Sequence, residues 1–177
     1  MGDLAYWPAA KPLSKKNTFA KNRDFIKNLD HIDQIWEKLK FKCGDTLAVC
    51  DLRGKYKEKF SYSELADLIT KVSFSFENYG LKKGDVVTVI SENSPRWLAV
   101  DQGLMRLGAI NAVRGINSPS VELDYIIGHS NSVGLIVQSK EIWLRLNNKE
   151  ELKKRLKFII NLEDEQFESV ISWSRFI

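Results

Sequence analysis

Residues 61–93 decide the fold, and they read SYSELADLITKVSFSFENYGLKKGDVVTVISEN. Ser61 and Glu64 form a capping box, in which each side chain satisfies the free backbone N–H of the other residue. The apolar residues that follow recur every three or four positions, which predicts an amphipathic helix that Gly80 ends. Residues 86–90, VVTVI, are all β-branched, which is typical of a strand buried on both faces.

The same alternation of helix and strand continues downstream. We expect helices over residues 96–107, from Ser118 to about residue 127, and over 140–157, with strands over 109–113, 133–137 and 158–162. Gly108 and Gly128 are expected to end the first two helices, and Ser118 to cap the second ahead of Pro119. Because consecutive strands joined by short crossover helices pair in parallel, we predict an α/β fold: a doubly wound, Rossmann-like, mainly parallel sheet with helices on both faces.

The region upstream of Ser61 is less regular. Residues 1–28 are interpreted as an irregular basic lead-in with a short helical stretch near residues 19–26, and residues 29–177 as one domain. Asp30 is a candidate cap for a helix with an apolar stripe at Ile32, Ile35, Trp36 and Leu39. Residues 46–51 and 59–61 then predict a β-hairpin that turns at residues 53–55.

Composition and charge restrict the class of protein. The 177 residues are 44% hydrophobic and 28% charged, as in ordinary globular proteins, and carry a net charge of +4. Residues 1–60 hold a net charge of +5 and the remainder −1, so the basic character belongs to a lysine-rich lead-in, and no nucleic-acid partner is expected. No apolar run approaches a membrane span, and Cys43 and Cys50 form no metal or disulfide pattern. We therefore expect a cytoplasmic protein with two buried thiols and, through the lysines near residues 11–21, a weak peripheral contact with anionic membrane.

The residues support no catalytic, cofactor-binding or metal site. Neither a GxxxxGK[ST] nor a GxGxxG phosphate loop occurs, and His129 is interpreted as a structural residue at a helix end. One loop is a candidate ligand-facing segment, because it follows the carboxyl end of a parallel strand: Ser91, Glu92, Asn93 and Ser94. Trp97 and Met105 on the next helix are expected to pack in the core.

An ordered set of motifs carries a family resemblance. It comprises Ser61, Tyr62, Glu64 and Leu65 at the helix entry; Gly80, Gly84 and Asp85 before the strand, with residues 86–93 and 95–97; Gly108; and Arg114, Gly115 and Pro119. In order and spacing this set resembles the front half of the large domain of adenylate-forming acid–thiol ligases. The run from residue 113 to Pro119 is most similar to the long-chain branch, the acyl-CoA and acyl-carrier-protein synthetases of cyanobacteria and plastids.

The resemblance implies an activity for the complete family member. Such enzymes activate a fatty acid with ATP and Mg²⁺ as an acyl-adenylate and transfer it to coenzyme A or acyl-carrier protein. The family's phosphate loop, adenine-binding segment, Mg²⁺ glutamate and C-terminal lysine lie beyond the matched segment, so no catalytic residue carries over. Residues 29–177 then correspond to a partial AMP-binding domain that ends before the phosphate loop, binds no cofactor by itself and is inactive alone.

Two alternatives remain open at this point. In the first, the chain is a non-catalytic split subunit whose exposed Trp173, Phe176 and Ile177 dock onto the missing part of the synthetase. In the second, it is a free-standing Rossmann-like domain that binds a small molecule or nucleic acid through its lysines.

Overall fold

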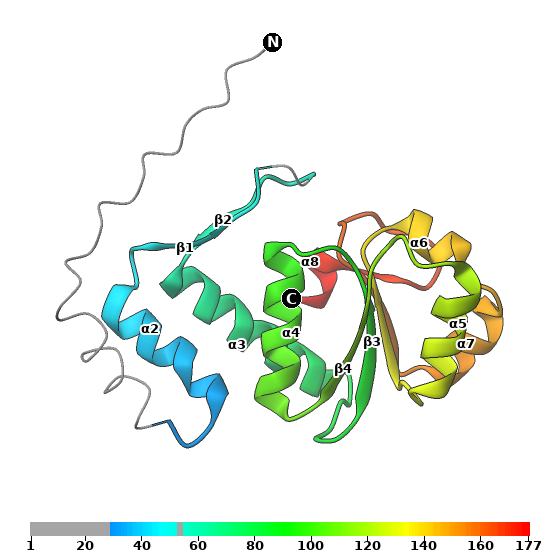
Figure 1. The fold of residues 1–177 in the computed structure, drawn as a ribbon, viewed down its shortest axis with the longest axis horizontal. Coiled ribbons are helices and arrows are strands. Elements are labelled where there is room, and N and C mark those ends of the chain that lie inside the picture. The colour runs from blue at the N-terminus through cyan, green and yellow to red at the C-terminus, as the bar shows by residue number, and fades with distance from the viewer. Residues whose placement is uncertain (1–28, 53–54) are drawn as a thin grey trace, which may run out of the picture. The chain divides into compact units, whose positions relative to one another are not determined.

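The computed structural model describes residues 29–52 and 55–177, and the chain divides into two compact units, Met1–Ile35 and Trp36–Ile177 (Figure 1). The basic lead-in and its lysines therefore lie outside the described residues. In the first unit the described part is a short 3₁₀ helix, η1 (Ile32–Gln34), whose N-cap is His31. The expected cap at Asp30 was wrong, because the helix begins one residue later, with His31 at the N-cap position; the backbone N–H of Asp30 donates to Gln34 Oε1 at 3.0 Å.

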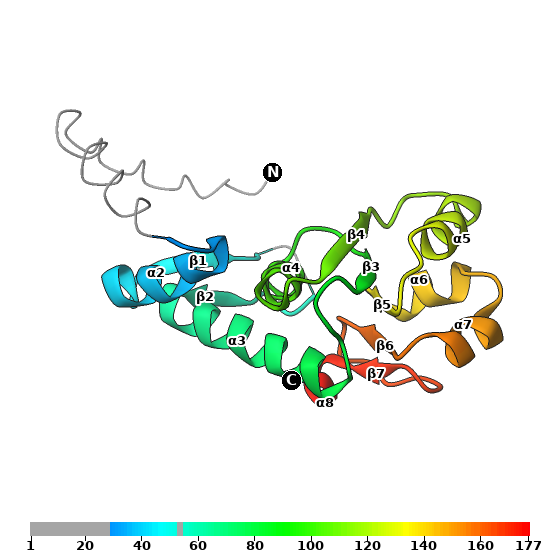
Figure 2. The same cartoon turned by 90° about the horizontal axis from the view of Figure 1, so that it is seen from below.

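The second unit is built on a five-stranded parallel sheet in the order β4-β3-β5-β6-β7 (Figure 2). The five strands are β3 (Val86–Ile90), β4 (Ile110–Arg114), β5 (Gly134–Val137), β6 (Phe158–Asn161) and β7 (Ile171–Ser172). The parallel doubly wound sheet predicted from the sequence is confirmed. The short strand β7, which follows a stretch without clear periodicity, is an addition to the prediction.

Helices cover both faces of this sheet. One face carries α3 (Tyr62–Asn78), α4 (Pro95–Leu107) and α8 (Trp173–Phe176); the other carries α5 (Ser120–His129), α6 (Lys140–Arg145) and α7 (Lys149–Arg155) (Figure 2). Successive strand residues point to opposite faces, so Val87 and Val89 join the core under α3 and α4 while Ile90 joins the core under α5 and α6. The central strands β3, β5 and β6 are therefore buried on both sides, as their β-branched composition indicates.

The helix caps explain why the elements begin and end where they do. The predicted capping box is present: Glu64 N–H donates to Ser61 Oγ at 3.2 Å, and Ser61 N–H donates to Glu64 Oε2 at 2.8 Å. Leu65, the next core-facing residue, is fully buried. Gly80 and Gly108 follow α3 and α4 with φ of +78° and +68°, a backbone conformation that glycine adopts without steric cost.

The turn before β3 is held by a solvent-accessible hydrogen-bond network around Asp85. Its Oδ2 accepts hydrogen bonds from the Lys82 backbone N–H at 2.9 Å and from Lys157 Nζ at 2.7 Å. Lys157 Nζ also donates to the Gly80 carbonyl at 2.8 Å. Gly84, within the turn, adopts a left-handed conformation with φ of +84°. The bond from Lys157 lowers the pKa of the Asp85 carboxyl. This network joins the entries of β3 and β6.

Three of the expected helix boundaries were wrong. Helix α5 begins at Ser120 with Pro119 as its N-cap, because the Ser118 hydroxyl lies 3.5 Å from the Glu122 carboxylate and its backbone N–H bonds to the Gly115 carbonyl. The helix also runs through Gly128 to His129. The single helix expected over 140–157 is two helices, α6 and α7, because Asn148 adopts a left-handed conformation at φ +50° between them.

The apolar side chains near residue 177 are core, not surface. Trp173 and Phe176 are 4% and 3% exposed, and the Phe176 ring lies 4.8 Å from that of Phe76. The expectation that these aromatics are exposed for docking was therefore wrong: α8 folds back onto the α3 face of the sheet. The alternative of a split subunit loses the observation on which it rested.

The remaining elements precede the sheet. Helix α2 (Ile35–Cys43) leads to the antiparallel hairpin of β1 (Leu47–Cys50) and β2 (Lys59–Ser61), as predicted; part of its turn lies outside the described residues. Cys43 and Cys50 are free and half-buried, rather than fully buried. Met105, expected in the core, is 37% exposed, because it lies on the outer side of α4. None of the helices in the described part of the chain combines the length and apolar character that crossing a membrane requires.

Candidate functional site

The strand order creates a topological switch point between β3 and β5. From β3 the chain passes outward to β4 and then returns to β5 on the other side of β3. In open parallel sheets the crevice outside the carboxyl ends of two such strands is where ligands bind, since the two connections leave in opposite directions. The loop after β3, residues 91–94, and Gln138 after β5 meet at this point.

The loop 91–94 is fixed by local hydrogen bonds. The Glu92 backbone N–H donates to Gln138 Oε1 at 2.9 Å, and the Ser91 hydroxyl donates to the Glu92 carbonyl at 2.7 Å. Ser94 caps α4, its Oγ accepting from the Trp97 N–H at 3.0 Å. Ser91 is buried, whereas Glu92 and Asn93 are exposed at the carboxyl edge of the sheet. Two of the four predicted ligand-facing residues, Glu92 and Asn93, are therefore exposed at this edge, while Ser94 is half-buried as the cap of α4 and Ser91 anchors the loop.

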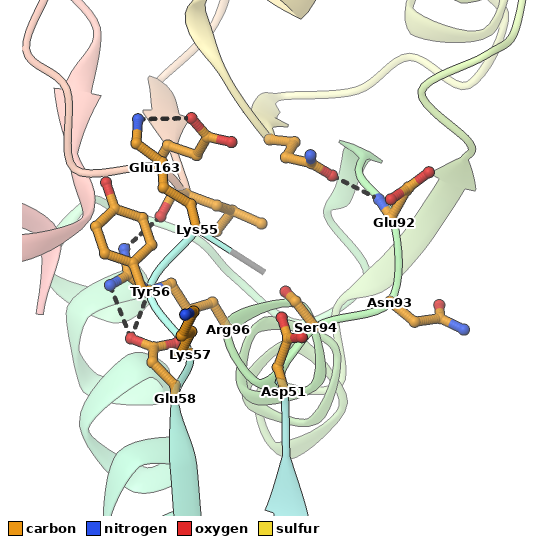
Figure 3. Close-up of a pocket in the computed structure, with 12 residues that line it drawn as sticks. Asp51, Lys55, Tyr56, Lys57, Glu58, Glu92, Asn93, Ser94, Arg96 and Glu163 are labelled. Carbon is orange, nitrogen blue, oxygen red and sulfur yellow. Dashed lines mark hydrogen bonds and ion pairs between the residues drawn. The ribbon is translucent and has the colours of Figure 1, made fainter. Parts of the chain in front are cut away.

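A cavity of about 310 Å³ lies over this edge (Figure 3). It has three walls: the β1–β2 hairpin, the loop leading into α4, and the two neighbouring segments that follow β5 and β6. The lining residues are Asp51, Lys55, Tyr56, Lys57, Glu58, Glu92, Asn93, Ser94, Arg96, Gln138, Leu162 and Glu163. Glu92, Asn93 and Ser94 from the predicted loop are among them, and Ser91 is not.

Arg96 joins the three walls of the cavity. Its Nε donates to Glu58 Oε1 at 2.8 Å, and its Nη1 donates to the Leu162 carbonyl at 2.6 Å. Its guanidinium lies 4.0 Å from the centroid of the Tyr56 ring, which covers it in Figure 3. Arg96 is only 8% exposed, so these contacts replace its hydration. No role for Arg96 is predicted from the sequence; a cation in the first turn of a helix opposes the helix dipole, and the Glu58 carboxylate offsets that effect here.

Further contacts hold the hairpin against the segment after β6. Lys55 Nζ lies 3.0 Å from Glu163 Oε2, and the Asp164 backbone N–H donates to the Tyr56 hydroxyl at 2.7 Å. The Asp164 carboxylate accepts from the Ser174 backbone N–H at 2.9 Å, and its hydrogen bonds with Ser174 lower the pKa of that carboxyl. The cavity walls are therefore cross-linked by side chains far apart in the sequence.

The residues of the cavity do not fit a nucleotide with its magnesium ion. Four acidic and three basic side chains line it, and two of the cations, Arg96 and Lys55, are engaged by Glu58 and Glu163. Stabilising a transferring phosphate takes uncommitted donors and a bound metal ion. Among residues 29–52 and 55–177, no group of three or more His, Cys, Asp or Glu residues is arranged to hold a metal ion.

Comparison with known proteins identifies the family. Residues 36–175 match the family model described as AMP-binding enzyme. The chain belongs to this family. The resemblance drawn from the ordered motifs is thereby confirmed, and so is the assignment to a family of ligases.

Two curated relatives from Arabidopsis thaliana match this chain over 135 residues. They are the probable acyl-activating enzyme 16, chloroplastic, at 35% identity, and the long-chain-fatty-acid–[acyl-carrier-protein] ligase AEE15, chloroplastic, at 33%. In both cases the match covers 76% of this chain and 19% of the relative. The chain thus corresponds to about a fifth of the length of these curated relatives.

Solved structures agree on the fold. A putative long-chain-fatty-acid CoA ligase from Rhodopseudomonas palustris superposes with a TM-score of 0.70 at 10% identity, covering 82% of this chain and 36% of the other. A mutant coronafacic acid ligase from Pectobacterium brasiliense gives 0.69 at 19% identity, covering 80% and 28%. At these identities the likeness concerns the fold alone.

Proposed function

We propose that this chain is the front part of a ligase that joins a long-chain fatty acid to a thiol. In the complete enzyme the carboxylate attacks the α-phosphate of ATP, giving an acyl-adenylate and pyrophosphate. The thiol of coenzyme A or of acyl-carrier protein then displaces AMP to give the thioester. The observation that carries the proposal is the match to two plant relatives, one of them by name a long-chain-fatty-acid–[acyl-carrier-protein] ligase.

The chain by itself is proposed to be inactive. Its cavity is lined by paired charges, with Arg96 held by Glu58 and the Leu162 carbonyl. The donors and the Mg²⁺ site that adenylation needs would come from the remainder of the synthetase. In that complete enzyme Glu92, Asn93 and Ser94, which line the cavity here, would form one wall of the ligand site.

A chimera tests the proposal. The 135 residues of the Arabidopsis AEE15 ligase that match this chain are replaced by the corresponding residues of this chain. ATP-dependent formation of long-chain acyl-carrier protein by the chimera is the expected result. A chimera that folds and binds ATP but forms neither an acyl-adenylate nor a thioester would contradict the assignment. The isolated chain serves as the matched control: pyrophosphate release from ATP and fatty acid by this chain alone would overturn its proposed inactivity.

We also propose a cytoplasmic location with a weak contact to anionic lipid through the basic N-terminal region, residues 11–21. Each lysine near an anionic surface contributes at most about 1 kcal/mol, an attraction that salt screens. Co-sedimentation with phosphatidylserine vesicles at low salt, lost on deletion of residues 1–28, is expected. Equal sedimentation of the full and shortened chains would argue against this contact.

A further inference from the structure

The loop after β3 is held from both sides of that strand. On the β4 side, the Ser91 backbone N–H donates to the Arg114 carbonyl at 3.1 Å. On the β5 side, the Glu92 backbone N–H donates to Gln138 Oε1 at 2.9 Å, and the Ser91 hydroxyl donates more weakly to the same oxygen at 3.4 Å. Among the described residues, the Gln138 side chain supplies the one hydrogen bond from outside the loop that holds residues 92 and 93.

The backbone of Gln138 is itself fixed by the sheet. Its N–H donates to the Ile90 carbonyl at 2.9 Å, and its carbonyl accepts from the Glu163 N–H at 2.9 Å. Residue 138 therefore extends the parallel ladder at the carboxyl ends of β3, β5 and β6, where it is half-buried. A side chain carried by such a rigid element places its partner more precisely than a side chain on a loop would.

The hydrogen bond also fixes which end of the Gln138 amide faces the loop. A backbone N–H can only donate, so the amide must present its oxygen, and not its nitrogen, to Glu92. The loop therefore requires an acceptor oxygen at the end of this side chain. A carboxylate of the same length supplies such an oxygen, whereas a thioether is a poor acceptor. Glutamate and methionine at this position therefore separate the role of the oxygen from that of the side chain's bulk.

We infer that Gln138 is a positioning residue of the ligand site: through the Glu92 N–H it fixes the wall that Glu92, Asn93 and Ser94 form beside the cavity (Figure 3). The inference rests on the proposed ligase function, in which this wall contacts a substrate. Gln138 acts through the loop and takes no part in the chemical step. A wall that is no longer held should therefore weaken substrate binding and leave turnover unchanged.

Steady-state kinetics of a chimera test this role. Residues 36–175 of this chain, the range of the family match, replace the corresponding residues of the Arabidopsis AEE15 ligase. Gln138→Met should raise the KM for fatty acid, ATP or acyl-carrier protein about three- to tenfold, as expected for the loss of one hydrogen bond, with kcat within about twofold. Gln138→Glu should bring that KM back to within about twofold of wild type, since its carboxylate still accepts from the Glu92 N–H.

Gln102→Met is the matched control. Gln102 Oε1 likewise accepts a hydrogen bond, from Trp36 Nε1 at 2.8 Å, but this residue does not line the cavity, so every KM should stay unchanged. An active chimera in which Gln138→Met leaves every KM unchanged would overturn this inference alone. So would a Gln138→Glu chimera as impaired as Gln138→Met, because the acceptor oxygen would then not be what matters. A wild-type chimera without activity would instead contradict the proposed function, and the inference with it.

Amide hydrogen exchange on the isolated chain tests the hydrogen bond without any need for activity. Relative to its intrinsic rate, the wild-type Glu92 N–H should exchange at least about tenfold more slowly than the Asn93 N–H, which has no acceptor among the described residues. Gln138→Met should remove this protection and Gln138→Glu should keep it, while the Ser91 N–H stays protected in every chain. Equal protection of Glu92 and Asn93 in the wild type would overturn the inference, whether or not the variants fold.

Discussion

Replacing Arg96 with methionine should destabilise the whole second unit. Methionine keeps much of the apolar stem but removes every donor of the guanidinium. Glu58 then loses its ionic partner at 2.7 Å, and the Leu162 carbonyl loses its donor at 2.6 Å. Glu58 and the Leu162 carbonyl belong to two different walls of the cavity. The substitution therefore also uncouples the hairpin from the end of β6.

The expected loss follows from the burial of the partners. A hydrogen bond to a charged group contributes about 1.5–3 kcal/mol, and removing one partner of a fully buried ion pair costs about 3–5 kcal/mol. The Glu58 side chain is 21% exposed, so water can still solvate part of its charge after Arg96 is removed. We therefore expect Arg96→Met to lower the free energy of unfolding by about 2–4 kcal/mol, a large fraction of the 5–15 kcal/mol typical of a domain.

Urea unfolding of four chains measures this coupling: wild type, Arg96→Met, Glu58→Gln and the double variant. Because the two side chains interact directly, the double variant should lose less than the sum of the single losses. Arg106→Met is the matched control, since Arg106 pairs with Glu37 only at 3.9 Å and near the surface; its loss should stay below about 1 kcal/mol. Arg96→Met within about 0.5 kcal/mol of wild type, or strictly additive losses, would refute the reasoning.

Three further predictions concern the scaffold. Lys157 lowers the pKa of Asp85 in the folded chain, so the ionised carboxylate stabilises the fold at any pH above its unfolded pKa of 3.8. This stability is lost as the pH falls through the lower, folded pKa. The difference in unfolding free energy between wild type and Asp85→Asn should therefore shrink in that range. A Cβ at Gly134 would lie 2.3 Å from the Phe158 ring, so Gly134→Ala should cost about 1–3 kcal/mol in urea unfolding, with partial recovery when Phe158→Leu is added. At Asn148, φ +50°, glycine should be tolerated within about 0.5 kcal/mol, whereas valine should lower the melting temperature clearly.

Local signals in the sequence predicted the regular elements well. Strand β3 occupies Val86–Ile90 as expected, because β-branched residues fill it and a glycine turn precedes it. The Ser61 capping box placed the start of α3 correctly because it too is a local signal: both of its hydrogen bonds lie within four residues. The break at Asn148 escaped prediction although the sequence carries a signal for it: the apolar spacing lengthens to six residues between Leu146 and Leu152, and asparagine, which adopts the left-handed conformation more readily than most residues, lies between them.

The parts of the site that sequence reasoning missed depend on contacts between distant segments. The loop Ser91–Ser94 could be proposed from the sequence because the carboxyl end of a parallel strand is a local property, but the cavity over it is made by Arg96 reaching Glu58 and Leu162, which are 38 and 66 residues away. The burial of Trp173 was missed for the same reason, since only the pairing of β7 with β6 brings it over the core. A cation in the first turn of α4 is unfavourable by about 0.3–1 kcal/mol by itself, and the Glu58 carboxylate beside Arg96 offsets this cost.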